Sequence, residues 1–209
     1  MRKNRITTLP PRPISASLLR VFCAIELPAE VRARAAEYIA RLREAVPDVR
    51  ANWERTEKIH ITLKFIGEIE SERIEALSFA ASRAAQAVRS FAIALEGTGA
   101  FPPSGSPRIL WLGINDASGS LARLQSCLEV ECASAGFARE ERAFHPHLTL
   151  ARIRAPQGAR GLASLHGKAD FAPIGFAVTD LVIMCSEPGQ EGSHYTEISR
   201  HRSKTEVSE

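Results

Sequence analysis

The chain has 209 residues, of which 44% are hydrophobic and 24% are charged. This is the composition of a globular protein, and it excludes collagen, coiled coils and a chain that is disordered throughout. No apolar run approaches the roughly 18 residues that a membrane-spanning helix requires. The net charge of +3 originates in residues 1–25, which hold five basic side chains and no acid, so the overall charge does not argue for nucleic-acid binding.

The N-terminal segment 1–18 is basic and lacks the hydrophobic region of a secretory signal. We expect a disordered basic extension, although an acid-free, Arg-rich segment is also typical of an organelle transit peptide. The four cysteines form no CxxC pair, which disfavours a structural zinc site. Cys23 and Cys185 lie in apolar runs and are expected to be buried free thiols, which indicates a reducing, cytoplasmic location.

The folded region is expected to begin near Leu19. Runs of apolar and β-branched residues predict four strands in the first half of the chain. They are Leu19–Ile25, Val49–Glu54, Ile59–Ile66 and Phe91–Leu95. Apolar residues at helical spacing predict two helices, one opened by Pro28 and ended by Pro47, the other capped by Ser71.

The Pro- and Gly-rich segment 101–107 precedes a second group of elements, and we interpret it as the crossover between two halves. A helix is expected from about Gly119 to Ala135, with Gly136 just past its end, and residues 156–175 have room for a short helix. The expected strands of this half are Ile109–Ile114, Phe144–Ala151, Leu181–Ser186 and His194–Ser199.

The sequence shows no regular strand–helix–strand alternation, no GxGxxG motif and no P-loop. The order of elements therefore favours an α+β fold with antiparallel sheets over a doubly wound parallel sheet. Because each half supplies strands and at least one long helix, we predict two pseudo-symmetric lobes in which helices flank the sheets. Residues 19–201 should form this single bilobal domain, and residues 202–209 a frayed tail.

Two matching tetrapeptides stand in corresponding positions of the two halves, His60-Ile-Thr-Leu63 and His147-Leu-Thr-Leu150. Each lies in a strand-like run, where residues i and i+2 point to the same face. Each motif therefore presents an imidazole and a hydroxyl side by side, on a strand that aliphatic residues anchor from the other face. A single copy is usually structural, but two copies at corresponding positions favour a functional pair that lines one central groove.

Two imidazoles and two hydroxyls around one groove suit an in-line displacement at phosphorus. One imidazole takes a proton from the nucleophile, and the other gives a proton to the leaving oxygen. Histidine serves either role because its unperturbed pKa lies near neutrality. The hydroxyls of Thr62 and Thr149 are able to donate hydrogen bonds to the non-bridging phosphate oxygens. This chemistry needs neither a metal nor a cofactor.

These motifs and their flanks resemble the two-histidine phosphoesterase superfamily, most closely the bacterial RNA 2′,3′-cyclic phosphodiesterases, also called 2′-5′ RNA ligases. The similarity runs in order from Arg20 to near His201. The segments that carry it are Arg20–Pro28, Asn52-Trp53, His60–Gly67, Phe101-Pro102, Pro107–Gly113, Gly136-Phe137 and Phe144–Arg152. The N-terminal extension lies outside the similarity.

The resemblance implies two α+β lobes with one HxTx motif each. It also implies metal-independent opening of RNA 2′,3′-cyclic phosphates to 2′-phosphomonoesters, with weak 2′-5′ ligation. In this scheme His60 is the proton donor to the 3′ leaving oxygen, and His147 is the base that activates water. Thr62 and Thr149 would hold the phosphate. The expected partner is RNA with a cyclic-phosphate end, and we expect a monomer that needs no metal and binds no membrane.

Two basic residues near the motifs are candidate substrate contacts. Lys64 lies two residues past Thr62, so alternation places it on the same face, where it contacts phosphate or is simply solvated. Arg152 ends the second motif segment. Strict alternation puts Arg152 on the wrong face unless the strand contains a bulge.

Three further residues have two interpretations each. His145 stands where the resemblance leads us to expect arginine more often, and histidine in place of arginine would weaken a phosphate or backbone contact there. With His147 it also forms an HxH pair of the kind that binds metals, although no third ligand is nearby in the sequence. Phe65 and Trp111 are candidates for stacking on a base, while core packing is the simpler role for each.

Two other functions compete with this prediction. One is a related two-histidine enzyme that acts on a different 2′-5′ or cyclic nucleotide. The other is a non-catalytic protein that binds RNA ends. The two intact HxTL copies disfavour the binder, because binding alone does not require two titrating imidazoles.

Overall fold

A computed structural model describes residues 17–189 and 193–204 of the chain. The described strands are β1 (Leu18–Glu26), β2 (Ala51–Trp53), β3 (His60–Glu70), β4 (Phe91–Phe101), β5 (Ile109–Asn115), β6 (His147–Ile153), β7 (Ile174–Val178), β8 (Asp180–Glu187) and β9 (His194–Arg202). The α-helices are α1 (Ala29–Ala45), α2 (Ile74–Gln86), α3 (Ser120–Ser134) and α4 (Ala159–Lys168). None of these helices is long and apolar enough to cross a membrane.

The strands form one antiparallel sheet in the order β7-β4-β5-β6-β3-β1-β8-β9, with β2 paired to β6. Its central link, between β3 and β6, is the single residue pair Ile61–Leu148. This narrow link divides the sheet into a first lobe (β3, β1, β8, β9) and a second lobe (β6, β5, β4, β7, β2). The predicted α+β fold with two lobes is confirmed, and each lobe carries one HxTx motif.

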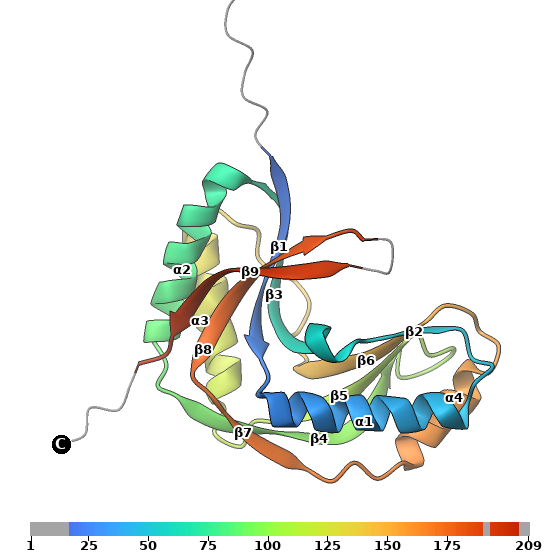
Figure 1. The fold of residues 1–209 in the computed structure, drawn as a ribbon. Helices are drawn as coiled ribbons and strands as arrows, with labels where there is room; N and C mark the ends of the chain where they lie inside the picture. Colours follow the sequence, from blue (N-terminus) through green and yellow to red (C-terminus); the bar gives the residue numbers. More distant parts are fainter. Residues whose placement is uncertain (1–16, 190–192, 205–209) are drawn as a thin grey trace, which may run out of the picture.

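Each lobe is covered by one helix from each half of the chain. Helix α1 follows β1 of the first lobe, yet it packs beside α4 under the second lobe (Figure 1). Helix α3 follows β5 of the second lobe, yet it lies beside α2 and contacts β3 in the first (Figure 1). The lobes are therefore tied together by exchanged helices as well as by the sheet.

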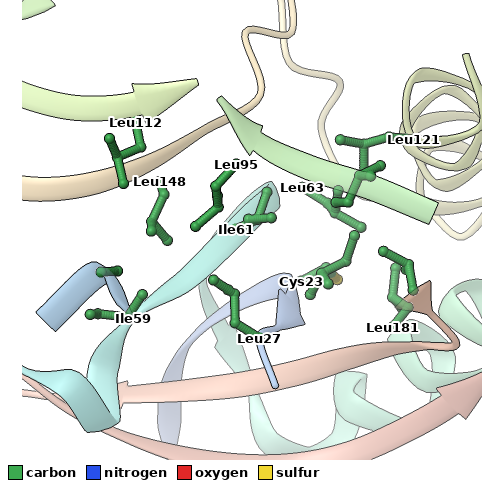
Figure 2. Close-up of a cluster of buried hydrophobic side chains, with 14 of the residues drawn as sticks. Cys23, Leu27, Ile59, Ile61, Leu63, Leu95, Leu112, Leu121, Leu148 and Leu181 are labelled. Carbon is green, nitrogen blue, oxygen red and sulfur yellow. The ribbon is translucent and has the colours of Figure 1, made fainter. Parts of the chain in front are cut away.

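A continuous hydrophobic core lies under the face of the sheet opposite the imidazoles. It brings together Ile61 and Leu63 of β3, Leu148 of β6 and Leu112 of β5, all buried (Figure 2). Cys23 of β1 is also fully buried in this core, as predicted. Each aliphatic residue alternates with the groove-facing residues of its strand, so burial of the core fixes the direction of the histidines.

Helix ends confirm some local predictions and correct one. Helix α1 begins directly after Pro28, and the last turn of α3 is followed by Gly136 in the left-handed region at φ 80°. Ser71 was expected to cap α2, but that prediction is wrong. It begins a short 3-10 turn, its hydroxyl donates to Glu72, and α2 starts three residues later at Ile74.

The interpretation of residues 101–107 as the crossover between halves is also wrong. Phe101 pairs with Ile109, so the segment is a hairpin loop between β4 and β5 within one lobe. The chain crosses between the lobes at several other points, among them α1 and α3, which pack on the opposite lobe, and the links from α2 to β4 and from β7 to β8. Proline and glycine indicate a turn, but they do not indicate which elements the turn joins.

The C-terminal part is more ordered than expected. Strand β7, which was not predicted, pairs with β4 at the edge of the second lobe. Strand β9 extends to Arg202, Ser203 is buried, and Lys204 bridges to Arg89. The predicted frayed tail 202–209 is therefore wrong for its first three residues, and residues 205–209 lie outside the described part. Of the predicted extension 1–18, residues 1–16 also lie outside it.

Candidate active site

The first imidazole stands at the start of β3 in an aromatic setting. The Nδ1 of His60 lies 2.7 Å from the Lys58 carbonyl oxygen, and its Nε2 lies 3.1 Å from the Thr62 hydroxyl. The ring of Phe22 lies over it at 4.8 Å between centroids, and Tyr195 meets it edge-on at 5.2 Å. Because a carbonyl oxygen only accepts hydrogen bonds, Nδ1 must donate, and Nε2 is the nitrogen available for proton transfer.

The second imidazole stands at the start of β6 and repeats this arrangement. The Nδ1 of His147 lies 2.7 Å from the carbonyl oxygen of His145, which is again two residues earlier. Phe101 meets the ring nearly perpendicularly at 5.2 Å, and Trp111 lies at 6.3 Å. His147 therefore also donates through Nδ1 and keeps Nε2 for chemistry.

The register between β3 and β6 brings the two motifs together. Ile61 is paired with Leu148, and in an antiparallel pair the neighbours on each side follow in opposite directions. His60 is therefore placed across from Thr149, and Thr62 across from His147. Each imidazole has the hydroxyl of the other motif as its cross-strand neighbour, which gives the site its pseudo-twofold symmetry.

Burial lowers the pKa of both catalytic candidates from the ordinary histidine value of 6.5. The hydrogen bonds to the carbonyls of Lys58 and His145 oppose this effect. The positive charge of Arg152 lowers the pKa of both His60 and His147. One guanidinium thus acts on both rings, which is consistent with its place in the wall of the same groove.

A β-bulge corrects the expectation for Lys64. The pairing of β1 with β3 skips a residue between Thr62 and Lys64, so Lys64 no longer alternates with Thr62 and is buried at the edge of the cavity. Its side chain is 1% exposed, and its ammonium donates to Glu129 at 2.7 Å and to the Ala138 carbonyl at 2.8 Å. The predicted phosphate contact by Lys64 is therefore not supported, since its charge is already paired.

The matching bulge in β6 has the opposite consequence for Arg152. The pairing of β5 with β6 skips Leu150, and both Leu150 and Ala151 are buried. Arg152 is therefore returned to the groove face, under the condition that the sequence analysis stated. Its Nε lies 4.0 Å from a carboxylate oxygen of Glu54, and much of the guanidinium stays exposed.

The remaining candidates separate by exposure. Phe65 lies five residues after His60, as Arg152 does after His147, and it is 57% exposed at the groove instead of packed in the core. Trp111 packs against Phe101, and its carbonyl accepts from the buried His166, so it is a structural residue next to the site.

His145 is exposed at the rim of the groove, near the ring of Phe101. Within the described residues, no three His, Cys, Asp or Glu side chains are grouped closely enough to hold a metal ion. The HxH pair with His147 therefore has no third protein ligand there.

All eight predicted site residues line one cavity of about 820 Å³. They are His60, Thr62, Lys64, Phe65, His145, His147, Thr149 and Arg152. A cavity of this volume is large enough for a nucleotide, and its wall presents two imidazoles, two threonine hydroxyls and an arginine.

The sequence was compared with known proteins. The profile of the LigT-like phosphoesterases matches it twice, over residues 25–111 and 112–195, so each repeat contains one histidine motif. The chain belongs to the LigT-like phosphoesterase family.

Several relatives in this family are named RNA 2′,3′-cyclic phosphodiesterase. The Escherichia coli protein is 31% identical over 87% of this chain and 94% of its own. The Thermotoga maritima protein is 32% identical over 85% of this chain and 91% of its own. The Aeropyrum pernix protein is 40% identical over 61% of this chain and 70% of its own.

Solved structures of the family have the same fold. E. coli LigT in complex with 3′-AMP matches 90% of this chain and 99% of its own, with a TM-score of 0.71 and 28% identity. A Thermus thermophilus protein matches 90% of this chain and all of its own, with a TM-score of 0.73 and 27% identity. The LigT-like fold therefore extends over nearly the whole described chain.

Sequence analysis missed part of the site of this LigT-like protein. Phe22, Phe101 and Tyr195, which enclose the two imidazoles, had no assigned role, and neither had Glu54 beside Arg152. Phe22 was detectable in principle, because it is a large apolar residue that alternates with the buried residues of β1. Tyr195 was not, because its contact with His60 depends on the pairing of distant strands.

Proposed function

We propose that this phosphoesterase hydrolyses 2′,3′-cyclic phosphate ends of RNA to 2′-phosphomonoesters, with His60 and His147 as acid and base and without a metal. The observation that carries the proposal is the pair of Nε2 atoms presented to one groove, each imidazole held by an Nδ1–H bond to a carbonyl two residues earlier. The names of the relatives support the cyclic phosphate as substrate.

The reaction follows from this arrangement. Neutral His147 takes a proton from water through Nε2, and the water oxygen attacks phosphorus. The bond from phosphorus to the 3′ oxygen breaks, and protonated His60 gives its Nε2 proton to that oxygen. The product carries a 2′-phosphate and a 3′-hydroxyl, and the two histidines have exchanged protonation states. A proton returns from His147 to His60 through solvent before the next turnover.

The phosphate is held by neutral and charged donors. In this proposal the hydroxyls of Thr62 and Thr149 donate hydrogen bonds to its non-bridging oxygens, which carry the negative charge of the transition state. Arg152 supplies a positive charge on the same face. Phe65 offers an exposed ring for stacking against the terminal base. Escherichia coli LigT has been crystallised with 3′-AMP and with phosphate, ligands of the size and charge of such a site.

The assignment of acid and base rests on the family resemblance, because the two motifs are nearly symmetric. His60 is enclosed by Phe22 and Tyr195 and bonded to Thr62, whereas no such hydroxyl bond is made by His147 among the described residues. We further propose weak 2′-5′ ligation by the reverse type of reaction. We also propose a monomer in the cytoplasm, where the four free thiols would stay reduced.

A turnover assay with a short RNA ending in a 2′,3′-cyclic phosphate tests this function against its rivals. The proposal predicts many turnovers per protein molecule. A non-catalytic binder would retain the RNA and return it unchanged. A two-histidine enzyme with another substrate would leave this RNA intact but cleave a 2′-5′-linked oligonucleotide offered in parallel.

We expect catalysis to be independent of divalent metal ions. Proton transfer by two imidazoles and charge stabilisation by hydroxyls and Arg152 supply the needs of the reaction. Purified protein should therefore keep its full kcat in excess EDTA. A loss of activity on chelation that a divalent ion restores would contradict the mechanism.

The pH dependence of kcat/KM should be bell-shaped, with its maximum below the ordinary histidine value of 6.5. The rate falls at low pH when the base becomes protonated, and it falls at high pH when the acid loses its proton. Because burial lowers the pKa of both rings, both limbs move to lower pH. The two apparent pKa values belong to the pair and not to single residues.

The pH profile of the Thr149→Val variant is the control. This change should lower kcat/KM without shifting the acidic or the alkaline limb of the bell-shaped curve. A rate of the unmodified protein that rises continuously into alkaline pH would show that no protonated acid takes part.

A further inference from the structure

The groove continues along β1 and β3 beyond the catalytic motifs. Arg20 and Phe22 of β1 line the groove, and Ala24 and Glu26 follow on the same face of the strand, because Cys23 and Ile25 between them are buried in the main core. The register pairs Ala24 with Thr62 and Phe22 with Phe65. Along β1, from Ala24 toward Arg20, the chain therefore passes first the histidine motif, then the aromatic pair Phe22 and Phe65, and then the positive charge of Arg20.

This order matches the end of an RNA chain. The terminal nucleoside has the cyclic phosphate on its 2′ and 3′ oxygens and a phosphodiester on its 5′ oxygen. If the cyclic phosphate lies at His60 and Thr62, the nucleoside lies by Phe22 and Phe65. The next phosphate then lies beyond them, near Arg20. Arg20 lies four residues from Ala24 along β1, about 13 Å between backbones, whereas successive phosphates of an RNA chain are about 7 Å apart, so the long Arg20 side chain must extend toward the aromatic pair to reach the next phosphate.

Three adjacent strands place hydrogen-bond donors side by side at this end. Ser186 of β8 is paired with Tyr195 of β9. The register of β1 with β8 pairs Val21 with Cys185, and one further step places Arg20 beside Ser186. Arg20, Ser186 and Tyr195 all line the groove, and within the described residues none of their side chains makes a hydrogen bond or ion pair.

The charge of Arg20 is less compensated than that of other arginines near the groove. Arg142 is held by two hydrogen bonds to Glu140, and Arg200 is bonded to Glu26 and Glu197. Arg20 faces Glu68 across the strand pair, but the two form no ion pair, and Glu68 does not line the groove. The positive charge of Arg20 also acts on the Tyr195 hydroxyl, whose pKa is raised mainly by burial.

We propose that Arg20, Ser186 and Tyr195 form a second phosphate site, which binds the phosphodiester on the 5′ side of the terminal nucleotide. The inference rests on the proposed function of the groove and extends it. It makes an RNA of two or more nucleotides the preferred substrate, over a single nucleoside 2′,3′-cyclic phosphate. The guanidinium contributes a positive charge, and the two hydroxyls contribute directional hydrogen bonds to the phosphate oxygens.

The test compares three substrates: a nucleoside 2′,3′-cyclic phosphate, a dinucleotide with the same end, and that dinucleotide with a neutral methylphosphonate linkage. The protein variants are Arg20→Gln and the matched control Arg34→Gln, which removes another exposed arginine, from α1 and away from the groove. The quantity measured is the ratio of kcat/KM for each dinucleotide to that for the mononucleotide.

We expect the unmodified protein to prefer the charged dinucleotide. Arg20→Gln should lower that preference by about three- to tenfold, which lies between the effect of a weak exposed ion pair and that of a strong hydrogen bond to a charged group. The methylphosphonate should lower it to a similar extent, and the two changes together should do no more than either alone. Tyr195→Phe, which keeps the ring against His60, should give a smaller loss in the same direction. Arg34→Gln should behave like the unmodified protein.

Two results would overturn the site. One is an unchanged dinucleotide preference in Arg20→Gln. The other is a loss in Arg20→Gln that is equally large with the neutral methylphosphonate linkage. If the unmodified protein hydrolysed none of the three substrates, the proposed function itself would fail, and that result differs from both of the others.

Discussion

Replacing either proposed catalytic histidine, His60 or His147, with alanine should lower kcat for cyclic-phosphate hydrolysis by about 10²–10⁴-fold, the range for a positioned acid or base. Each ring is half-buried, and a hydrogen bond to a backbone carbonyl fixes its orientation. Alanine removes both the titrating group and this orientation. The measurement is single-turnover hydrolysis of a short RNA with a 2′,3′-cyclic phosphate. Melting curves of His60→Ala and His147→Ala should stay close to that of the unmodified protein.

Three further variants are compared with the loss of activity in the two histidine variants. Thr62→Val and Thr149→Val each remove one donor to the phosphate and should cost less than a histidine. His145→Ala removes an exposed imidazole of the same type from the rim of the same groove, and it should cost least. If His145→Ala were as damaging as His147→Ala, the roles within the HxH pair would be wrongly assigned.

A substrate with a better leaving group should separate the two histidines. Sulfur in place of the bridging 3′ oxygen leaves as a thiolate, which needs little protonation. The loss in His60→Ala should then shrink from about 10²–10⁴-fold to about tenfold or less, because the general acid has become unnecessary. The loss in His147→Ala should persist, because water must still be deprotonated. The measurement is kcat of both variants on matched oxygen and sulfur substrates.

The structure explains why this test has two distinguishable outcomes. His60 and His147 have separate aromatic neighbours and separate carbonyl partners, so loss of one ring need not disturb the other. Rescue of His147→Ala by sulfur would exchange the roles and leave the two-histidine mechanism in place. Rescue of neither variant would contradict the assignment of a general acid to this pair.

The position of the two histidines and two threonines on the groove face was predictable because their signal is local. Period-two alternation at Ile61 and Leu63, and again at Leu148 and Leu150, fixes which face is buried. The imidazoles and hydroxyls between them must then face the other way. The repetition of the motif in two halves also indicated the two lobes.

What the sequence did not predict depends on pairing between distant strands. The bulges after Thr62 and Thr149 turn Lys64 inward and Arg152 outward, and no residue type in the sequence indicates where these bulges lie. The exchange of helices between lobes could not be read from the order of elements, so the hairpin loop at 101–107 was taken for a crossover. The contact of Tyr195 with His60 likewise needs the complete sheet.

The position of the phosphate in the product tests the central claim most directly. A short RNA with a 2′,3′-cyclic phosphate is incubated with the protein, and the product is identified by phosphorus NMR against authentic 2′- and 3′-phosphates. A variant that lacks both imidazoles, His60→Ala with His147→Ala, serves as the control. The mechanism predicts a 2′-phosphomonoester with the unmodified protein and unchanged RNA with the double variant. A 3′-phosphomonoester, or the same turnover by the double variant, would contradict it.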